Sequence, residues 1–237
     1  NVNGNSASAG REYSVDATAP AVTIDTVAGD NVINASEASA GVAITGTTTA
    51  EAGQTVTVTL GNKQYTAQVQ AGGTWSVNVP GADLTAMADN GYTVQVSVSD
   101  AAGNPGSADK AITLDTTPPV ISFNAVAVDD VINSVEHAQA QIVSGSATGA
   151  NVGDRLVITV GSHQYTTTVD ASGNWSVGVP ASVISSLADG TATLSATITD
   201  SAGNSSTKTQ KVMVKTASRE LSVNTIAGDD VLNAAEA

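Results

Sequence analysis

The chain contains no cysteine among its 237 residues, and it is poor in aromatic side chains. Without cysteine no disulfide can hold small domains together, although this absence does not by itself identify a cellular compartment. A single large core usually relies on Leu, Ile and Phe, and this chain has one Phe. No apolar run approaches the roughly 20 residues that a membrane-spanning helix needs. These absences favour several small domains without a membrane-inserted segment.

Basic residues are also scarce, with 8 Lys and Arg against 22 Asp and Glu, for a net charge of -14. This balance argues against nucleic acid or an anionic membrane surface as a partner. The excess of carboxylates leaves two interpretations, which are solubility through repulsion and the binding of cations. The first ten residues have neither a basic start nor an apolar stretch, so they are not expected to be a signal peptide.

The usual signatures of catalysis are missing as well. The sequence contains no G-x-S-x-G, no phosphate-binding P-loop and no cysteine nucleophile. Its two histidines do not recur, because His137 aligns with Ala38 and His163 aligns with Lys63. The sequence therefore predicts a protein that is not an enzyme.

Internal repetition is the strongest feature that the sequence does have. "TWSVNVP" (74–80) returns as "NWSVGVP" (174–180), and "SDAAGN" (99–104) returns as "TDSAGN" (199–204). A period near 100 residues indicates a tandem array, and we expect the chain to be a window on a longer one. Four segments are predicted: the last strand of a preceding repeat (1–17), two complete repeats (18–116 and 117–216), and the start of another (217–237).

Each repeat carries seven short segments with alternating polar and apolar residues. In the first repeat they lie at 20–27, 42–48, 55–60, 64–69, 75–79, 92–100 and 109–115. Turns rich in Gly and Asn separate them, so the pattern predicts an all-β fold of tandem immunoglobulin-like Greek-key β-sandwiches arranged as a rod. We expect short helical turns only at 81–89 and 181–189. The predicted core anchors are Trp75, Tyr65, Trp175 and Tyr165.

One acidic word occurs three times, as "AGDNVINASEA" (28–38), "AVDDVINSVEH" (127–137) and "AGDDVLNAAEA" (227–237). Its Asn and Glu stand three residues apart, which is the spacing of a helix capping box. Capping would explain Asn34 with Glu37, and Asn133 with Glu136, without any metal ion. It would not explain the adjacent acids Asp129 and Asp130.

The acids of this word and of two other segments are expected to meet at the junctions between repeats. The groups are Asp16, Asp30 and Glu37; then Asp100, Asp115, Asp129, Asp130 and Glu136; then Asp200, Asp229, Asp230 and Glu236. Two carboxylates about 5 Å apart repel by roughly 3 kcal/mol at an effective dielectric constant near 20. Oxygen ligands without His or Cys favour Ca²⁺ over zinc or copper. The sequence therefore predicts one Ca²⁺ at each junction, with Asn34 and Asn133 as further ligands.

The ordered set "DTTPPV", "VDDVINSVEH", "GNWSVGVP" and "ITDSAGN" resembles the bacterial Ig-like repeats of giant type I-secreted adhesins. The resemblance covers the whole chain. It implies a long stalk at the bacterial surface, stiffened by Ca²⁺ near successive domains. Adjacent repeats would then be its partners, with host-cell glycans bound through the full-length adhesin.

One junction departs from the pattern, because "DTTPP" (115–119) becomes "KTASR" (215–219). Lys215 replaces the linker Asp and Arg219 replaces a Pro, so we expect a weaker or differently built Ca²⁺ site there. The alternative to a spacer is a module that binds a ligand through variable loops, such as 81–91 or 181–190. Such a module would carry an exposed aromatic patch in one repeat only, and the sequence shows none.

Overall fold

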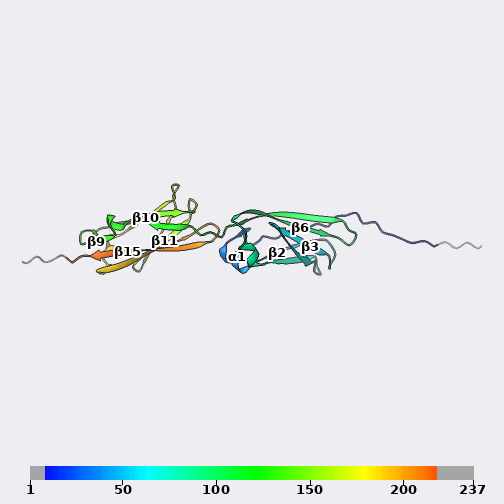
Figure 1. The fold of residues 1–237 in the computed structure, drawn as a ribbon, viewed down its shortest axis with the longest axis horizontal. Coiled ribbons are helices and arrows are strands. Elements are labelled where there is room, and N and C mark those ends of the chain that lie inside the picture. The colour runs from blue at the N-terminus through cyan, green and yellow to red at the C-terminus, as the bar shows by residue number, and fades with distance from the viewer. Residues whose placement is uncertain (1–8, 218–237) are drawn as a thin grey trace, which may run out of the picture. The chain divides into compact units, whose positions relative to one another are not determined.

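A computed structural model describes residues 9–217, which form two compact units. Unit 1 holds residues 9–118 together with the loop Ser201–Asn204, and unit 2 holds residues 119–200 and 205–217. No helix in the described part of the chain is long and apolar enough to cross a membrane. Figure 1 shows that strands dominate both units and that helices are few and short.

Unit 1 is a sandwich of two sheets (Figure 1). Its larger sheet has the strand order β1-β7-β6-β3-β4, and β2 pairs with β5 in the other sheet. The strands are β1 (Val32–Ile33), β2 (Val42–Thr47), β3 (Thr55–Leu60), β4 (Lys63–Gln68), β5 (Thr74–Val79), β6 (Asn90–Ser99) and β7 (Pro105–Leu114). The helices are α1 (Ala35–Ala40) and α2 (Gly81–Leu84).

Unit 2 repeats this plan, with the strand order β12-β11-β14-β15-β9 in its larger sheet and β13-β10-β8 in the other. Its strands are β8 (Val120–Phe123), β9 (Val131–Asn133), β10 (Gln141–Thr148), β11 (Arg155–Val160), β12 (His163–Thr168), β13 (Asn174–Val179), β14 (Gly190–Thr199) and β15 (Ser205–Lys215). Its helical turns are η1 (Val126–Val128), η2 (Glu136–Ala138) and α3 (Ala181–Ile184). The predicted all-β, immunoglobulin-like class is confirmed.

The first predicted strand of unit 1, 20–27, forms only in part. Val22 makes an isolated bridge to Thr48, and the amides of Thr23 and Asp25 donate to carbonyls of β2. The matching segment of unit 2 is the regular strand β8, which pairs with β10 over four residues. The predicted segment therefore pairs with β2 in unit 1, but it is not a continuous strand.

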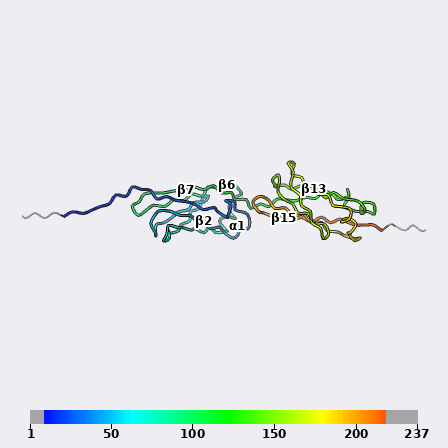
Figure 2. Tube along the Cα trace, turned by 180° about the vertical axis from the view of Figure 1, so that it is seen from behind, coloured from blue at the N-terminus to red at the C-terminus, as the bar shows by residue number. Residues whose placement is uncertain are grey.

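A short parallel strand, which the alternation pattern does not predict, closes one edge of each larger sheet. In unit 1, Val32 and Ile33 of β1 pair with Thr113 and Leu114 at the end of β7. The helix α1 follows directly, so it lies at the end of unit 1 where β7 finishes, as both ribbon and tube show (Figures 1 and 2). In unit 2, β9 pairs with the end of β15 in the same way. The pairing places the acidic word beside the residues where the chain leaves each sheet.

Both cores are built mainly from Val, Ile and Leu around one tryptophan each. Trp75 and Trp175 are each 2% exposed, which confirms them as core residues. Tyr65 and Tyr165 are partly buried and pack against these cores. The second core adds an edge-to-face contact between Trp175 and Phe123, with ring centroids 5.2 Å apart.

A strand glycine lets the chain pack closely against each tryptophan. A Cβ atom added at Gly46 would collide with the Thr23 carbonyl and with the Trp75 ring, and Gly145 is placed in the same way against Ser122 and Trp175. The glycines are therefore required by the close approach of two strands and an indole ring.

Gly46→Ala should lower the free energy of unfolding of unit 1 by about 3 kcal/mol, because backbone must shift to admit the methyl group. Chemical denaturation followed by Trp75 fluorescence, in a Trp175→Phe background, isolates unit 1. Gly91→Ala is the matched control, since it is also in a strand and its added Cβ meets no atom within 4 Å. Equal stabilities of the two variants would contradict this account of Gly46.

Candidate functional site

The Asn and Glu of the acidic word form a capping box at the start of α1. Asn34 Oδ1 accepts the backbone N–H groups of Ser36 and Glu37, both at 3.0 Å. Glu37 Oε2 accepts the backbone N–H of Asn34 at 3.0 Å. The capping interpretation is therefore confirmed in the first repeat.

The same three hydrogen bonds occur in the second repeat. Asn133 Oδ1 accepts from the amides of Val135 and Glu136, and Glu136 Oε2 accepts from the amide of Asn133. The helical turn that follows is the 3₁₀ turn η2 in place of an α-helix. Capping uses one oxygen of each Glu, and a carboxylate has two, so this role is compatible with a bound cation.

The adjacent acids have a structural role of their own in the turn before the parallel strand. Asp129 Oδ1 accepts the amide of Val131 at 3.0 Å, and Asp130 Oδ1 accepts the amide of Val126 at 2.9 Å. Asp130 has a φ of 62°, a left-handed conformation that Asp and Asn tolerate better than most residues. The pair of acids therefore closes this loop through hydrogen bonds to two backbone amides.

The first repeat makes the same turn with one charge fewer. Asp30 Oδ1 accepts the amide of Val32 at 2.9 Å, and Asn31 Oδ1 accepts the amide of Val27 at 3.0 Å. Asn31, whose φ is 67°, matches Asp130. An uncharged Asn serves equally well at this position, which shows that the turn requires an acceptor oxygen and a left-handed residue, not a charge.

The loop before the last strand carries an asparagine that the sequence reasoning missed. Asn104 Nδ2 donates to Asp100 Oδ2 at 2.9 Å and to the Asp16 carbonyl at 3.2 Å. Hydrogen bonds from Asn104, led by its side chain, hold the pKa of Asp100 below its ordinary value, while desolvation opposes them. Asp16 Oδ1 accepts the amide of Thr18. The asparagine therefore links this loop to the backbone of Asp16.

The equivalent residue, Asn204, makes the corresponding contact with Asp115. Its loop belongs to unit 1, where Asn204 is 4% exposed. Asn204 Nδ2 donates to the Asp115 carbonyl at 2.9 Å, and its Oδ1 accepts the amide of Ala35 at 2.8 Å. The recurring "D-x-A-G-N" word contained this signal, because its last residue is as constant between repeats as its first.

The structure separates some acids that the sequence placed together. Asp100 and Asp115 flank the two ends of β7, a strand of ten residues, so they lie about 33 Å apart. Asp115 instead lies beyond the β1 pairing, at the end of unit 1 that carries Asn34 and Glu37. One Ca²⁺ cannot take both Asp100 and Asp115 as ligands, and the predicted group must be divided between the two ends of the sandwich.

The acids of unit 2 divide in the same manner. Asp200 precedes β15, whereas Asn133 pairs with Lys215 at the other end of that strand. Asp229, Asp230 and Glu236 lie outside the described residues. Within residues 9–217, no three His, Cys, Asp or Glu side chains are grouped closely enough to hold a metal ion by themselves.

The chemistry of the group at the end of unit 1 fits part of a Ca²⁺ shell. Asn34, Glu37 and Asp115 supply only oxygen donors, and two of the three are carboxylates. Ca²⁺ takes six to eight oxygens, which commonly include backbone carbonyls and water. Asn34 Oδ1 already accepts two backbone N–H groups in the cap, so Glu37 and Asp115 would hold the ion and other oxygens would have to complete the shell.

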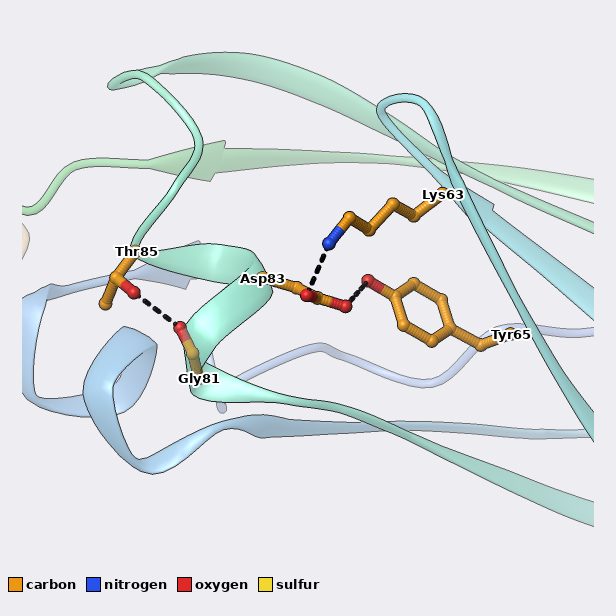
Figure 3. Close-up of polar contacts among 5 residues, drawn as sticks. All are labelled: Lys63, Tyr65, Gly81, Asp83 and Thr85. Carbon is orange, nitrogen blue, oxygen red and sulfur yellow. Dashed lines mark hydrogen bonds and ion pairs between the residues drawn. The ribbon is translucent and has the colours of Figure 1, made fainter.

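A second polar cluster, drawn in Figure 3, occurs in the first repeat only. Asp83 at α2 binds Lys63 Nζ through Oδ1 at 2.5 Å and accepts the Tyr65 hydroxyl on Oδ2 at 2.7 Å. In the second repeat Val183 stands in place of Asp83 and His163 in place of Lys63. Burial, and then the hydrogen bond and charge of Asp83, raise the pKa of Tyr65 to about 12.

These features define a class: tandem immunoglobulin-like sandwiches whose polar residues mainly organise turns, caps and linkers. The chain belongs to the bacterial Ig-like domain family, whose pattern matches residues 21–116 and 133–216. Domains of this kind in adhesins are structural, and the prediction that the chain is not an enzyme is confirmed. No curated protein matches the chain.

Two solved structures of bacterial adhesins share this fold. One is a Ca²⁺-stabilised adhesin with which an Antarctic bacterium binds ice, 40% identical over 93% of this chain with a TM-score of 0.55. The other is from a 1.5-MDa bacterial ice-binding adhesin studied for its retention at the host cell surface, 36% identical over 84% of this chain with a TM-score of 0.52. This chain spans 55% and 65% of those two structures, respectively. It is therefore an adhesin-type Ig-like segment.

Asp83→Val, which installs the residue of the second repeat, should bring the pKa of Tyr65 part of the way from about 12 back toward 10.0. Because folding raises this pKa, the neutral phenol's contribution to stability is complete below pH 10 and is lost as the pH rises toward 12. Residue-resolved NMR titration of ¹³C-labelled tyrosines measures the change, with Tyr165 as internal reference. An unchanged Tyr65 titration would show that Asp83 is not a cause of the shift.

Proposed function

We propose that this chain is an extender segment of a large secreted bacterial surface adhesin, and that Ca²⁺ bound near the repeat ends stiffens it. In the full-length adhesin this stalk would hold an adhesive domain away from the bacterial surface. The observation that carries the proposal is the clustering of oxygen donors at the end of unit 1. There the β1–β7 pairing brings Asn34 and Glu37 to the linker residue Asp115.

A cation at that position would have a direct physical effect. The chain has a net charge of -14, so its carboxylates repel one another and leave the ends of the repeats loosely coupled. Ca²⁺ binding would neutralise part of this charge and tie the linker residue to the helix cap. The solved adhesin described as Ca²⁺-stabilised is 40% identical to this chain, which supports the assignment of the ion.

The finer features of the proposal concern export and partners. We place the segment outside the cell or at its surface, exported by a type I system, with adjacent repeats as its direct partners. Host-cell contact, including any contact with glycans, would belong to the full-length adhesin. Among adhesins, the ordered repeat words point to the Salmonella non-fimbrial adhesin SiiE, and this placement stays a prediction.

A ligand-binding module is the second candidate, and one cavity favours it. Near the loop 81–91 of unit 1 there is a cavity of about 170 Å³ lined by Leu60, Asn62, Lys63, Tyr65, Asp83, Ala86 and Met87. Its carboxylate already binds Lys63 and Tyr65, so a ligand would have to compete with both. Binding of this segment to a glycan array, lost in Asp83→Val, would favour the module over the spacer.

Removal of Ca²⁺ should shorten the average end-to-end distance of the chain and lower its melting temperature. When the free Ca²⁺ concentration is one hundred times the Kd of a site, binding adds about 2.7 kcal/mol to the free energy of unfolding, and chelation would remove this contribution. Small-angle scattering and calorimetry with Ca²⁺, with chelator, and with Mg²⁺ make the test. Mg²⁺ is the control because it demands stricter octahedral geometry and keeps its waters. Identical profiles with Ca²⁺ and chelator would rule out Ca²⁺ stiffening.

Exchanging the two linker residues tests which end binds the ion. Asp115→Lys should weaken Ca²⁺ binding at the first linker at least about tenfold, because it replaces a carboxylate ligand with a cation. Lys215→Asp should strengthen or create binding at the second linker. Titration calorimetry of both single variants and of the double variant, which keeps the net charge, measures sites and affinities. Unchanged isotherms in both single variants would exclude these linker positions as ligands.

A further inference from the structure

Asp89, which has no part in the predicted Ca²⁺ site, holds the first residues of the linker. Its Oδ1 accepts the Thr116 backbone N–H at 2.9 Å and the Thr116 hydroxyl at 2.8 Å. Its Oδ2 accepts the Thr117 hydroxyl at 2.6 Å. Both carboxylate oxygens are therefore engaged by two consecutive linker residues.

The strand register explains why Asp89 reaches this segment. β6 and β7 are antiparallel, and Asn90 at the start of β6 pairs with Leu114 at the end of β7. Asp89 stands one residue before β6, and Thr116 stands two residues after β7. The backbone N–H of Thr116 lies beyond the last residue pair of β6 and β7, so the side chain of Asp89 supplies its acceptor.

The second repeat contains the same contact in a reduced form. Asp189 Oδ1 accepts the Thr216 backbone N–H at 3.0 Å and its hydroxyl at 2.6 Å. The residue after Thr216 is Ala217, which has no hydroxyl to match that of Thr117. The contact therefore recurs at a spacing of one repeat, but with one hydrogen bond fewer.

The two residues after Thr117 connect this contact to the direction in which the chain leaves the first sandwich. Pro118 and Pro119 follow, and each has a fixed φ and no backbone N–H to donate. Because these two prolines restrict the backbone, the orientation of Thr116 and Thr117 also sets the orientation of the residues that follow them. In the second linker, Ser218 and Arg219 stand where the first has the two prolines.

We propose that Asp89 is a metal-independent clamp that sets the direction in which the chain leaves the first sandwich, and that Asp189 is its weaker counterpart. The hydrogen bonds from Thr117 and Thr116 also hold the pKa of Asp89 below its ordinary value, so the acceptor is ionised at neutral pH. The clamp stands apart from the Ca²⁺ proposal, because it needs no ion. It provides stiffness that chelation does not remove.

The clamp is tested in chelator with the whole chain and the variants Asp89→Ala and Thr117→Ala. The absence of native cysteine allows one spin label to be placed on each sandwich for pulsed distance measurements. Asp89→Ala should broaden the distance distribution and speed amide exchange at Thr116 about tenfold, the effect of losing one net hydrogen bond. Thr117→Ala, which copies the second linker, should broaden the distribution less.

Two controls separate a clamp from general destabilisation. Asp109→Asn removes the same charge from an exposed position on β7 and should leave the distribution unchanged. Exchange of core amides in β3 reports whether unit 1 stays folded in each variant. If Asp89→Ala leaves the distribution as narrow as in the unmodified chain, the clamp is wrong, even where Thr116 exchange has increased.

Adding Ca²⁺ to the same samples keeps the two proposals distinguishable. If Ca²⁺ narrows the spin-label distance distribution both in the unmodified chain and in Asp89→Ala, the result supports the cation proposal. The difference between those two proteins in chelator reports the clamp alone. Either proposal can therefore fail while the other holds.

Discussion

The parallel pairing of a two-residue strand with the end of the last strand is the constraint on which the functional geometry of unit 1 depends. Ile33 and Leu114 are paired in this ladder and each is 1% exposed, so the contact is part of the core. The next residue on one side is the helix cap Asn34, and on the other it is the linker residue Asp115. Burial of two aliphatic side chains thus decides which polar groups meet at the surface.

Carboxylates in these repeats act first as acceptors for backbone amides. Asp129 and Asp130 close a turn, Glu37 completes a helix cap, and Asp89 continues a strand ladder beyond its last residue. Without aromatic bulk or disulfides, small sandwiches need their loops held by such contacts. This role also concentrates acidic oxygens at the ends of the sandwich, where a cation can use those that remain. Structural and ligand roles of one carboxylate are therefore compatible.

The two repeats share a scaffold but differ in how they hold the chain that leaves them. The first linker has Asp115, Thr117 and two prolines, whereas the second has Lys215 and Ala217 and lacks those prolines. The turn before the parallel strand differs in the opposite sense, with Asn31 in the first repeat and Asp130 in the second. Charge is thus redistributed between repeats while the backbone arrangement is kept. The linkers and turns can therefore differ in sequence between repeats without a change of fold.

The sequence by itself determined the fold class and the two core tryptophans, because these depend on local alternation and burial. Its three-residue Asn–Glu spacing predicted the capping boxes as one of two interpretations, and the structure decided for them. The sequence could not show that β1 pairs in parallel with β7, since two residues carry no periodicity. For that reason it placed Asp100 and Asp115 together, although a ten-residue strand separates them. Asn204 and Asp89 were also missed, because their partners lie far away in the chain. Only the tertiary structure decided these contacts, since strand register brings together residues that sequence distance does not relate.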